Sequence, residues 1–188
     1  MLRLSLISLL LAFSASASAD NFDYNYLSLG YGNTDFDGIG DGDGFTLGGS
    51  YAFNGKYHAF ARYESAELAS VIDATRWQAG VGYNRWLTDR VDLVARLSYE
   101  YVEFDSGILA SADDTGFGLS VGVRYRSSDK LELSAAIKRT DYSDFGDDTG
   151  LEVGALYKLT NIYSLGVRAD WGDDVNTFTL SGRFYFGK

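Results

Sequence analysis

Apolar and polar residues alternate with period two along almost the whole chain after residue 22. In the segment 26–32, for example, large apolar side chains alternate with serine and glycine. This alternation is typical of β-strands whose two faces meet different surroundings. Ten such segments occur, at 26–32, 45–53, 57–64, 76–84, 91–101, 117–126, 131–138, 151–159, 163–171 and 178–186. We therefore predict ten strands, with eight as the alternative if one hairpin is merged or dropped.

The links between the predicted strands fall into a short and a long class. Short links occupy 54–56, 87–90, 127–130 and 160–162, and longer, mostly acidic ones occupy 33–43, 65–74, 105–115, 141–149 and 172–176. Short turns at one end and longer loops at the other are typical of a meander of antiparallel hairpins. The predicted fold class is all-β, a closed antiparallel up-and-down barrel.

A transmembrane barrel explains this pattern better than a soluble β-sandwich. Every predicted strand carries one apolar face, whereas the edge and central strands of a sandwich would differ more. The chain has no proline, which would remove hydrogen-bond donors from a sheet. In lipid all backbone polar groups must be paired, so a spanning sheet closes on itself. Aromatic residues near the strand ends suit two interfacial girdles, namely Tyr24, Tyr51, Phe53, Tyr57, Trp77, Tyr83, Trp86, Tyr99, Tyr101, Tyr125, Tyr157, Tyr163, Trp171, Phe184 and Phe186.

Residues 1–19 have the features of a secretory signal peptide. Arg3 precedes an apolar run, and Ala17-Ser18-Ala19 matches a small-residue cleavage site. About 10 apolar residues are too few to cross a bilayer core of about 30 Å. We predict cleavage after Ala19 and a transmembrane barrel domain over 20–188, with short turns in the periplasm and the acidic loops outside the cell.

The composition argues against several classes of function. The 188 residues include no cysteine, which excludes disulfides and thiol catalysis, and only one histidine, His58. The formal net charge of −10 argues against a nucleic-acid partner, which needs a basic surface. His58 follows the short link 54–56, away from the long loops where a catalytic base of a barrel hydrolase would lie. We predict a structural ring near the interface and no enzyme.

The first predicted hairpin resembles that of a known family. It consists of YNYLSLGY at 24–31, the glycine- and aspartate-rich link at 35–44 and FTLGGSYAF at 45–53. The chain resembles the small bacterial outer-membrane β-barrel proteins of the OmpA/OmpX kind, and is similar to the short barrels once labelled sulfation-dependent quorum factor. The resemblance implies an outer-membrane location and a non-enzymatic role.

The expected partners follow from this location. The last strand, with Phe184 and Phe186, resembles the insertion signal read by the barrel-assembly machinery, but here Gly187 and Lys188 follow the final aromatic residue. We also expect contact with outer-membrane lipid and lipopolysaccharide.

The polar face of the predicted strands carries many charges, and in a closed barrel these face the lumen. They are Arg62, Glu64, Arg76, Asp92, Arg96, Glu100, Arg124, Arg126, Glu132, Lys138, Glu152, Lys158, Arg168, Asp170 and Arg183. Buried charges must be paired, and a barrel of eight to ten strands is almost filled by its own side chains. We therefore predict a lumen plugged by ion pairs and a structural or surface-interaction role, such as envelope integrity or adhesion. A narrow porin-like channel is the alternative.

Acidic residues gather in the five long links, which contain no Lys or Arg. They are Asp35, Asp37, Asp41, Asp43, Glu67, Asp73, Asp105, Asp113, Asp114, Asp141, Asp144, Asp147, Asp148, Asp173 and Asp174. The simpler interpretation is a solvated loop crown. Since Ca²⁺ prefers clustered carboxylate oxygens on glycine-bent loops, Asp35, Asp37, Asp41 and Asp43 are the candidate calcium ligands, although the EF-hand pattern is absent. No other cofactor is predicted.

Overall fold

The computed structural model describes residues 22–38, 40–68, 72–106, 109–173 and 175–187. The predicted signal peptide at 1–19 and Asp174 of the acidic links lie outside these residues. In the part of the chain that is described, no helix is long and apolar enough to cross a membrane.

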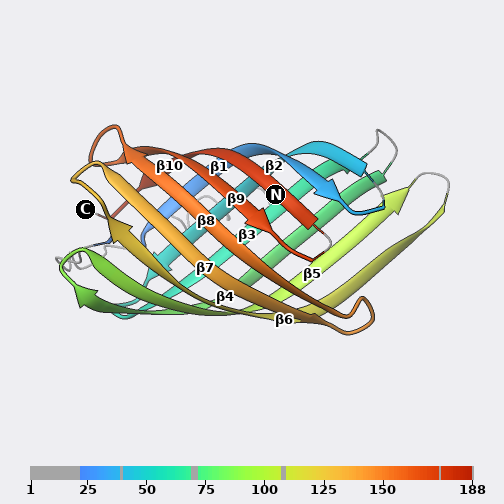
Figure 1. The fold of residues 1–188 in the computed structure, drawn as a ribbon, viewed down its shortest axis with the longest axis horizontal. Coiled ribbons are helices and arrows are strands. Elements are labelled where there is room, and N and C mark those ends of the chain that lie inside the picture. Colours follow the sequence, from blue (N-terminus) through green and yellow to red (C-terminus); the bar gives the residue numbers. More distant parts are fainter. Residues whose placement is uncertain (1–21, 39, 69–71, 107–108, 174, 188) are drawn as a thin grey trace, which may run out of the picture.

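The described residues form ten antiparallel strands that close into one barrel (Figure 1). The strands are β1 (Tyr26–Phe36), β2 (Gly40–Ala52), β3 (Tyr57–Leu68), β4 (Ile72–Thr88), β5 (Val91–Ser106), β6 (Leu109–Arg126), β7 (Leu131–Tyr142), β8 (Asp147–Lys158), β9 (Tyr163–Trp171) and β10 (Val175–Tyr185). Each pairs with its neighbours in sequence, and β1 pairs with β10 to close the ring. The prediction of ten strands is confirmed, and the alternative of eight is wrong.

The barrel has two unlike ends. At one end, which we name the short-turn end after its predicted links, two to four residues join β2 to β3, β4 to β5, β6 to β7 and β8 to β9. At the opposite end, which we name the rim, β1 connects to β2, β3 to β4, β5 to β6, β7 to β8 and β9 to β10. The rim is uneven, because β4, β5 and β6 have 17, 16 and 18 residues whereas β9 and β10 have 9 and 11.

The strands extend further toward the rim than the sequence pattern predicts. Most of the residues assigned to long links continue the strands, and only two to four residues separate paired strands there. In β2, Asp41 and Asp43 point outward, and the alternating Gly40, Gly42 and Gly44 point inward. The apolar alternation stops because the outward residues meet water instead of lipid, while the backbone pairing continues. The rim therefore consists of acidic extended hairpins.

The outer surface of the barrel is a broad apolar band. Leu29, Phe117 and Ile137 are 63%, 65% and 64% exposed. Rings also pack side by side on neighbouring strands, with the centroids of Trp77 and Tyr101 5.6 Å apart. Such a surface suits lipid, because a soluble protein rarely exposes a continuous apolar area of this kind.

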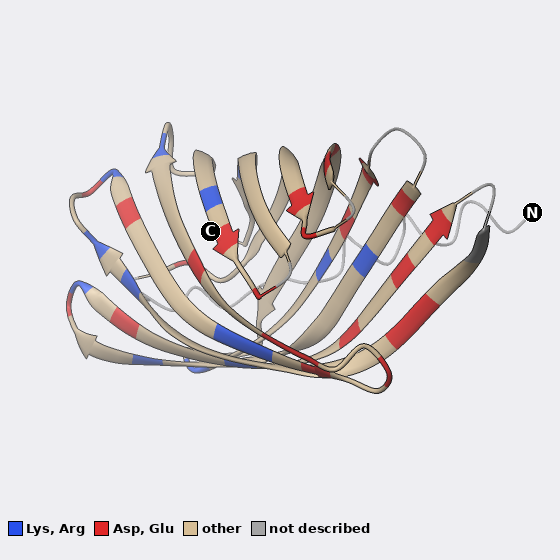
Figure 2. Cartoon of the chain, turned by 45° about the vertical axis from the view of Figure 1, so that its right-hand side comes forward, with Lys and Arg blue, Asp and Glu red and all other residues tan. Residues whose placement is uncertain are grey.

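Charges separate along the barrel axis. Figure 2 shows Asp and Glu mostly toward the rim, and Lys and Arg more frequently toward the short-turn end and along the strands. The concentration of acidic residues predicted from the sequence is therefore retained in the fold.

Candidate functional site

The start of the described chain fills the short-turn end of the lumen. Phe22 and Tyr24 precede β1 and are only 2% and 3% exposed. They form an apolar cluster with Val94 of β5. The side chain of Asn25 ties the segment to β2, because its Oδ1 accepts a hydrogen bond from the backbone N–H of Ala52 at 2.8 Å. We name Phe22 to Asn25 the N-terminal plug.

Tyr24 is the best-anchored residue of the N-terminal plug. Its hydroxyl donates to Asp92 Oδ2 at 3.0 Å, and its ring stacks on that of His58 with centroids 4.6 Å apart. The guanidinium of Arg124 lies 4.4 Å from the ring centroid. Burial raises the pKa of the Tyr24 phenol to about 12, so it remains a protonated donor at neutral pH. Its predicted place in an aromatic girdle is therefore wrong, since a tyrosine suits any site that is apolar around the ring and polar at the tip.

His58 lies at the short-turn end, as the sequence indicates, but its side chain is fully buried in the lumen against Tyr24 and Arg96 and is not at the interface. Its Nδ1 is 3.4 Å from Asn84 Oδ1, and its Nε2 accepts a hydrogen bond from Arg96 Nε at 3.4 Å. Gly82 lies opposite on β4, where a Cβ would come within 2.2 Å of the imidazole. His58 is thus a packing partner of Tyr24.

The predicted lumen charges all occupy positions that are buried or half-buried, and most of them form ion pairs inside the lumen, two of which join opposite sides of the barrel. The ion pairs are Arg62–Glu152 at 3.4 Å, Arg76–Glu100 at 3.6 Å, Lys138–Glu100 at 3.4 Å, Arg124–Glu132 at 2.7 Å, Arg168–Glu64 at 2.5 Å and Arg168–Asp170 at 2.7 Å. Arg96 and Arg183 lie over aromatic rings, those of Phe60 and Tyr26, at 5.1 Å and 3.9 Å. The fold therefore brings together the charges that the alternation places inside.

Glu100 is the centre of this network. Its side chain is 0% exposed, and two cations share it. Ser98 Oγ also donates to Glu100 Oε1 at 2.7 Å. The lumen retains two cavities of about 130 Å³ and 80 Å³, both lined by Arg62, Arg96 and Glu152, and the smaller one is also lined by Arg76, Ser98 and Lys138.

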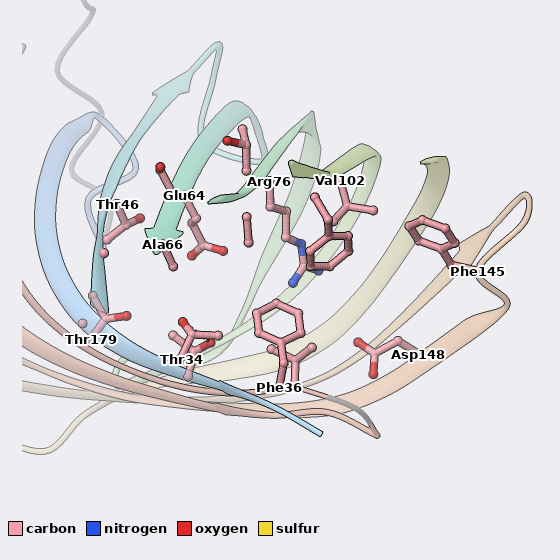
Figure 3. A pocket seen from close by; sticks show the side chains of 18 of the residues that line it. Thr34, Phe36, Thr46, Glu64, Ala66, Arg76, Val102, Phe145, Asp148 and Thr179 are labelled. Atoms are coloured by element: carbon pink, nitrogen blue, oxygen red, sulfur yellow. Dashed lines mark hydrogen bonds between the residues drawn. The ribbon is translucent and has the colours of Figure 1, made fainter. Parts of the chain in front are cut away.

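A larger cavity of about 450 Å³ opens at the rim (Figure 3). We name it the rim cavity. Its wall carries three connected rings, since Phe104 of β5 lies 5.5 Å from Phe36 of β1 and 6.2 Å from Phe145 of the turn between β7 and β8, centroid to centroid. Glu64 and Arg76 line its inner part, where it meets the charged lumen.

The rim cavity was not predicted from the sequence, although the residues of β5 carry a signal for it. Val102 and Phe104 have the same inward parity as Glu100 and continue that face with apolar residues. Phe104 immediately precedes the link predicted for 105–115, and a link has no inward face on which a cavity would be expected. That these residues oppose β1 becomes evident only once the barrel is closed.

Asp114 has a structural role, although its position suggested an acidic loop crown. It is 5% exposed, and its Oδ2 accepts hydrogen bonds from the backbone N–H groups of Asp144 and Phe145 at 2.7 Å and 2.8 Å. Its Oδ1 accepts from the N–H of Thr115 at 2.7 Å. Asp114 therefore fixes the turn that carries Phe145 over the rim cavity.

The candidate calcium ligands are spread over the first hairpin. Asp35 and Asp41 lie opposite each other on β1 and β2, Asp43 lies opposite Asn33, and Asp37 lies in the turn. All four aspartates are exposed. Among the described residues, no group of three or more histidine or carboxylate side chains is placed to hold a metal ion. The calcium site stays a prediction.

Four of the outward acids instead form a row across neighbouring strands. Asp43 is opposite Glu67, Glu67 is opposite Asp73, and Asp73 is opposite Asp105. We name this row the carboxylate ladder. Like charges directly opposite in a sheet repel each other, so the ladder costs stability unless cations screen it.

Comparisons with known proteins agree with this architecture. The chain matches the family model described as outer membrane protein β-barrel domain over residues 5–158. The solved structure of the NanC porin has 11% sequence identity and a TM-score of 0.58, over 85% of this chain and 100% of that chain. The KdgM porin has 13% identity and a TM-score of 0.49, over 85% and 99%. Ail, the attachment invasion locus protein of Yersinia pestis, has 16% identity and a TM-score of 0.44, over 88% and 100%. At 11% identity the likeness to NanC shows the fold alone. No curated protein sequence matches the chain significantly.

Proposed function

Because this chain belongs to the family of outer membrane protein β-barrel domains, we propose that it is a closed barrel with a structural and surface-contact role in the bacterial envelope. The observation that carries this proposal is the closure of the lumen at two levels. Phe22 and Tyr24 fill the short-turn end, and further toward the rim the ion pairs Arg62–Glu152 and Glu64–Arg168 join β3 to β8 and β9 across the lumen. A barrel closed in this way does not conduct solutes, so its hairpins outside the membrane are left as its surface for contacts.

The proposed processing and assembly accord with this role. Cleavage after Ala19 would leave two residues, Asp20 and Asn21, before Phe22, so that no long apolar segment precedes the N-terminal plug. The outward aromatic residue Phe184 on the last strand supports recognition by the barrel-assembly machinery. We expect both steps to precede closure of the short-turn end.

The acidic rim is the proposed contact surface. The carboxylate ladder lies on the outer face beyond the apolar band. We expect the phosphates of lipopolysaccharide at this level of the membrane, and they are anionic like the ladder. Divalent cations such as Ca²⁺ would bridge the two, and Asp35, Asp37, Asp41 and Asp43 would contribute carboxylates. Calorimetric titration of the barrel with Ca²⁺ tests this part, and no heat above a buffer blank contradicts it.

We propose no enzymatic activity for the barrel. A general base must reach its substrate, and the buried His58 packs against Tyr24 at the short-turn end. Purified wild-type protein should therefore hydrolyse neither lipid nor peptide, and hydrolysis of either one that His58→Gln abolishes would refute this.

A deletion strain tests the proposed role directly. Cells without the protein should admit more of a hydrophobic dye through the outer membrane or adhere less to surfaces, and wild-type protein should reverse whichever defect is found. A variant with asparagine at Asp43 and glutamine at Glu67 should restore dye exclusion less well, because the rim loses cation-bridged contacts. Unchanged dye entry and unchanged adhesion in the deletion strain would contradict the proposal.

The second candidate function is a narrow porin-like channel. It is favoured by the two lumen cavities, whose linings include Arg62, Arg96 and Glu152 and, for the larger one, Arg124 and Arg183. A path with this excess of arginine would select anions. An anion-selective current through the purified barrel would support this candidate, and the absence of current would exclude it.

A further inference from the structure

We infer that the rim cavity is a binding site for a small lipophilic organic cation. This inference goes beyond the closed-barrel function and does not depend on whether the lumen conducts. It follows from the size of the cavity, its aromatic wall and the sign of its charges.

The size and lining of the cavity suit a compact organic molecule. Its volume of about 450 Å³ lies within the range of about 300–1,000 Å³ that small-molecule sites occupy. Phe36, Val102 and Phe104 face it from β1 and β5, and Ala66 and Val175 complete an apolar wall. An apolar group placed there is shielded from water on every side except that of the opening.

The charges of the lining favour a cation. Four carboxylates and one guanidinium line the cavity, those of Asp37, Glu64, Asp147, Asp148 and Arg76. Glu64 is paired with Arg168, and Asp147 with Arg139 at 2.8 Å. The guanidinium of Arg76 is 3.6 Å from Glu100, which Lys138 also contacts, so the charge of Arg76 is offset in part.

Asp148 is the carboxylate best placed to bind the cationic group. It forms no ion pair with a described Lys or Arg, and its Oδ1 accepts a hydrogen bond from the backbone N–H of Asp173 at 2.9 Å. Figure 3 shows it at the same opening as the rings of Phe36 and Phe145. A cation beside Asp148 can therefore also meet aromatic faces, which attract positive charge when they lie within about 6 Å of it.

The acidic rim adds a second contribution at longer range. The outward carboxylates of the carboxylate ladder lie on the hairpins that surround the opening. A field of one sign around a concave site raises the local concentration of oppositely charged ligands, and salt weakens this effect. The turn with Phe145 is held in place by Asp114, so the aromatic wall is already formed before a ligand arrives.

Titration with benzyltrimethylammonium tests the inference. The complete barrel is held in maltoside micelles, because detergents with quaternary ammonium headgroups would compete. Chemical shifts or heats are recorded against this cation and, separately, against benzenesulfonate as an anion of similar size. The wild-type protein should bind the cation saturably and the anion much less.

Matched variants locate the site. Asp148→Asn keeps the acceptor for Asp173 and should weaken cation binding about tenfold, which corresponds to about 1.4 kcal/mol, while Asp144→Asn in the neighbouring exposed turn should not. Ala66→Leu fills the cavity and should abolish binding, whereas Ala61→Leu on the outer face should leave it unchanged. Lack of saturable cation binding, equal binding of benzenesulfonate, or full binding in both Asp148→Asn and Ala66→Leu would overturn the inference.

Discussion

Glu100 offers a test of whether the lumen is a dry network of ion pairs or a wet channel. Glu100→Gln removes the carboxylate that Arg76 and Lys138 share at 3.6 Å and 3.4 Å. The glutamine keeps nearly the same volume and an oxygen that can accept the hydrogen bond from Ser98. The substitution therefore removes charge with little change in packing.

The size of the effect depends on the surroundings of these charges. At about 3.5 Å, one pair interacts by about 5 kcal/mol at an effective dielectric constant of about 20, but by only about 1 kcal/mol in bulk water. Removing one partner of a buried pair costs about 3–5 kcal/mol. Because the side chains of Arg76 and Lys138 are 26% and 23% exposed, we expect the lower end, about 3 kcal/mol.

Urea unfolding of the barrel in lipid vesicles, followed by tryptophan fluorescence, measures this difference. Asp147→Asn is the control, because it removes the exposed pair with Arg139, whose side chains are 51% and 61% exposed, and should cost at most about 1 kcal/mol. If Glu100→Gln costs no more than this control, the lumen charges are solvated and the argument for a plug fails.

Three further outcomes follow from the packing. Tyr24→Phe should lower the free energy of unfolding by about 1 kcal/mol through one lost hydrogen bond, and Tyr24→Ala by about 3–5 kcal/mol through a lost buried ring, both measured by urea unfolding. Gly82→Ala should lower the free energy of unfolding by about 1–3 kcal/mol, because the added Cβ would overlap His58. Gly182→Ala should be nearly neutral, since no atom lies within 4 Å of the added Cβ. Equal losses of stability in the two variants would contradict the packing described. Glu67→Gln should stabilise the barrel by up to about 1 kcal/mol in low salt and less in high salt, since it relieves repulsion in the carboxylate ladder.

The strands and the lumen charges could be predicted because both depend on period-two alternation alone. Where lipid lies on one side of a strand and a packed lumen on the other, the two faces carry different kinds of residue, such as the outward Leu29 and the inward Glu100. The strand ends toward the rim could not be predicted in this way, because Asp41 and Asp43 face water and no longer show an apolar contrast with the alternating glycines.

The contacts across the lumen could not be predicted, because they depend on how the barrel closes. Arg62 and Glu152 are 90 positions apart and meet only after the strands are wound into a ring. The N-terminal plug was missed because Phe22 and Tyr24 precede the first strand, and their aromatic rings suit a membrane interface as well as a lumen.

Single-channel recording of the purified, complete barrel in planar lipid bilayers tests the central claim most directly. With the N-terminal plug and the Glu100 network in place, the barrel should give no discrete current steps. A variant that lacks Phe22 to Asn25 should show more frequent current noise, because it retains only the ion pairs as a barrier. Steady, discrete channels from the wild-type protein would contradict the account of a closed lumen.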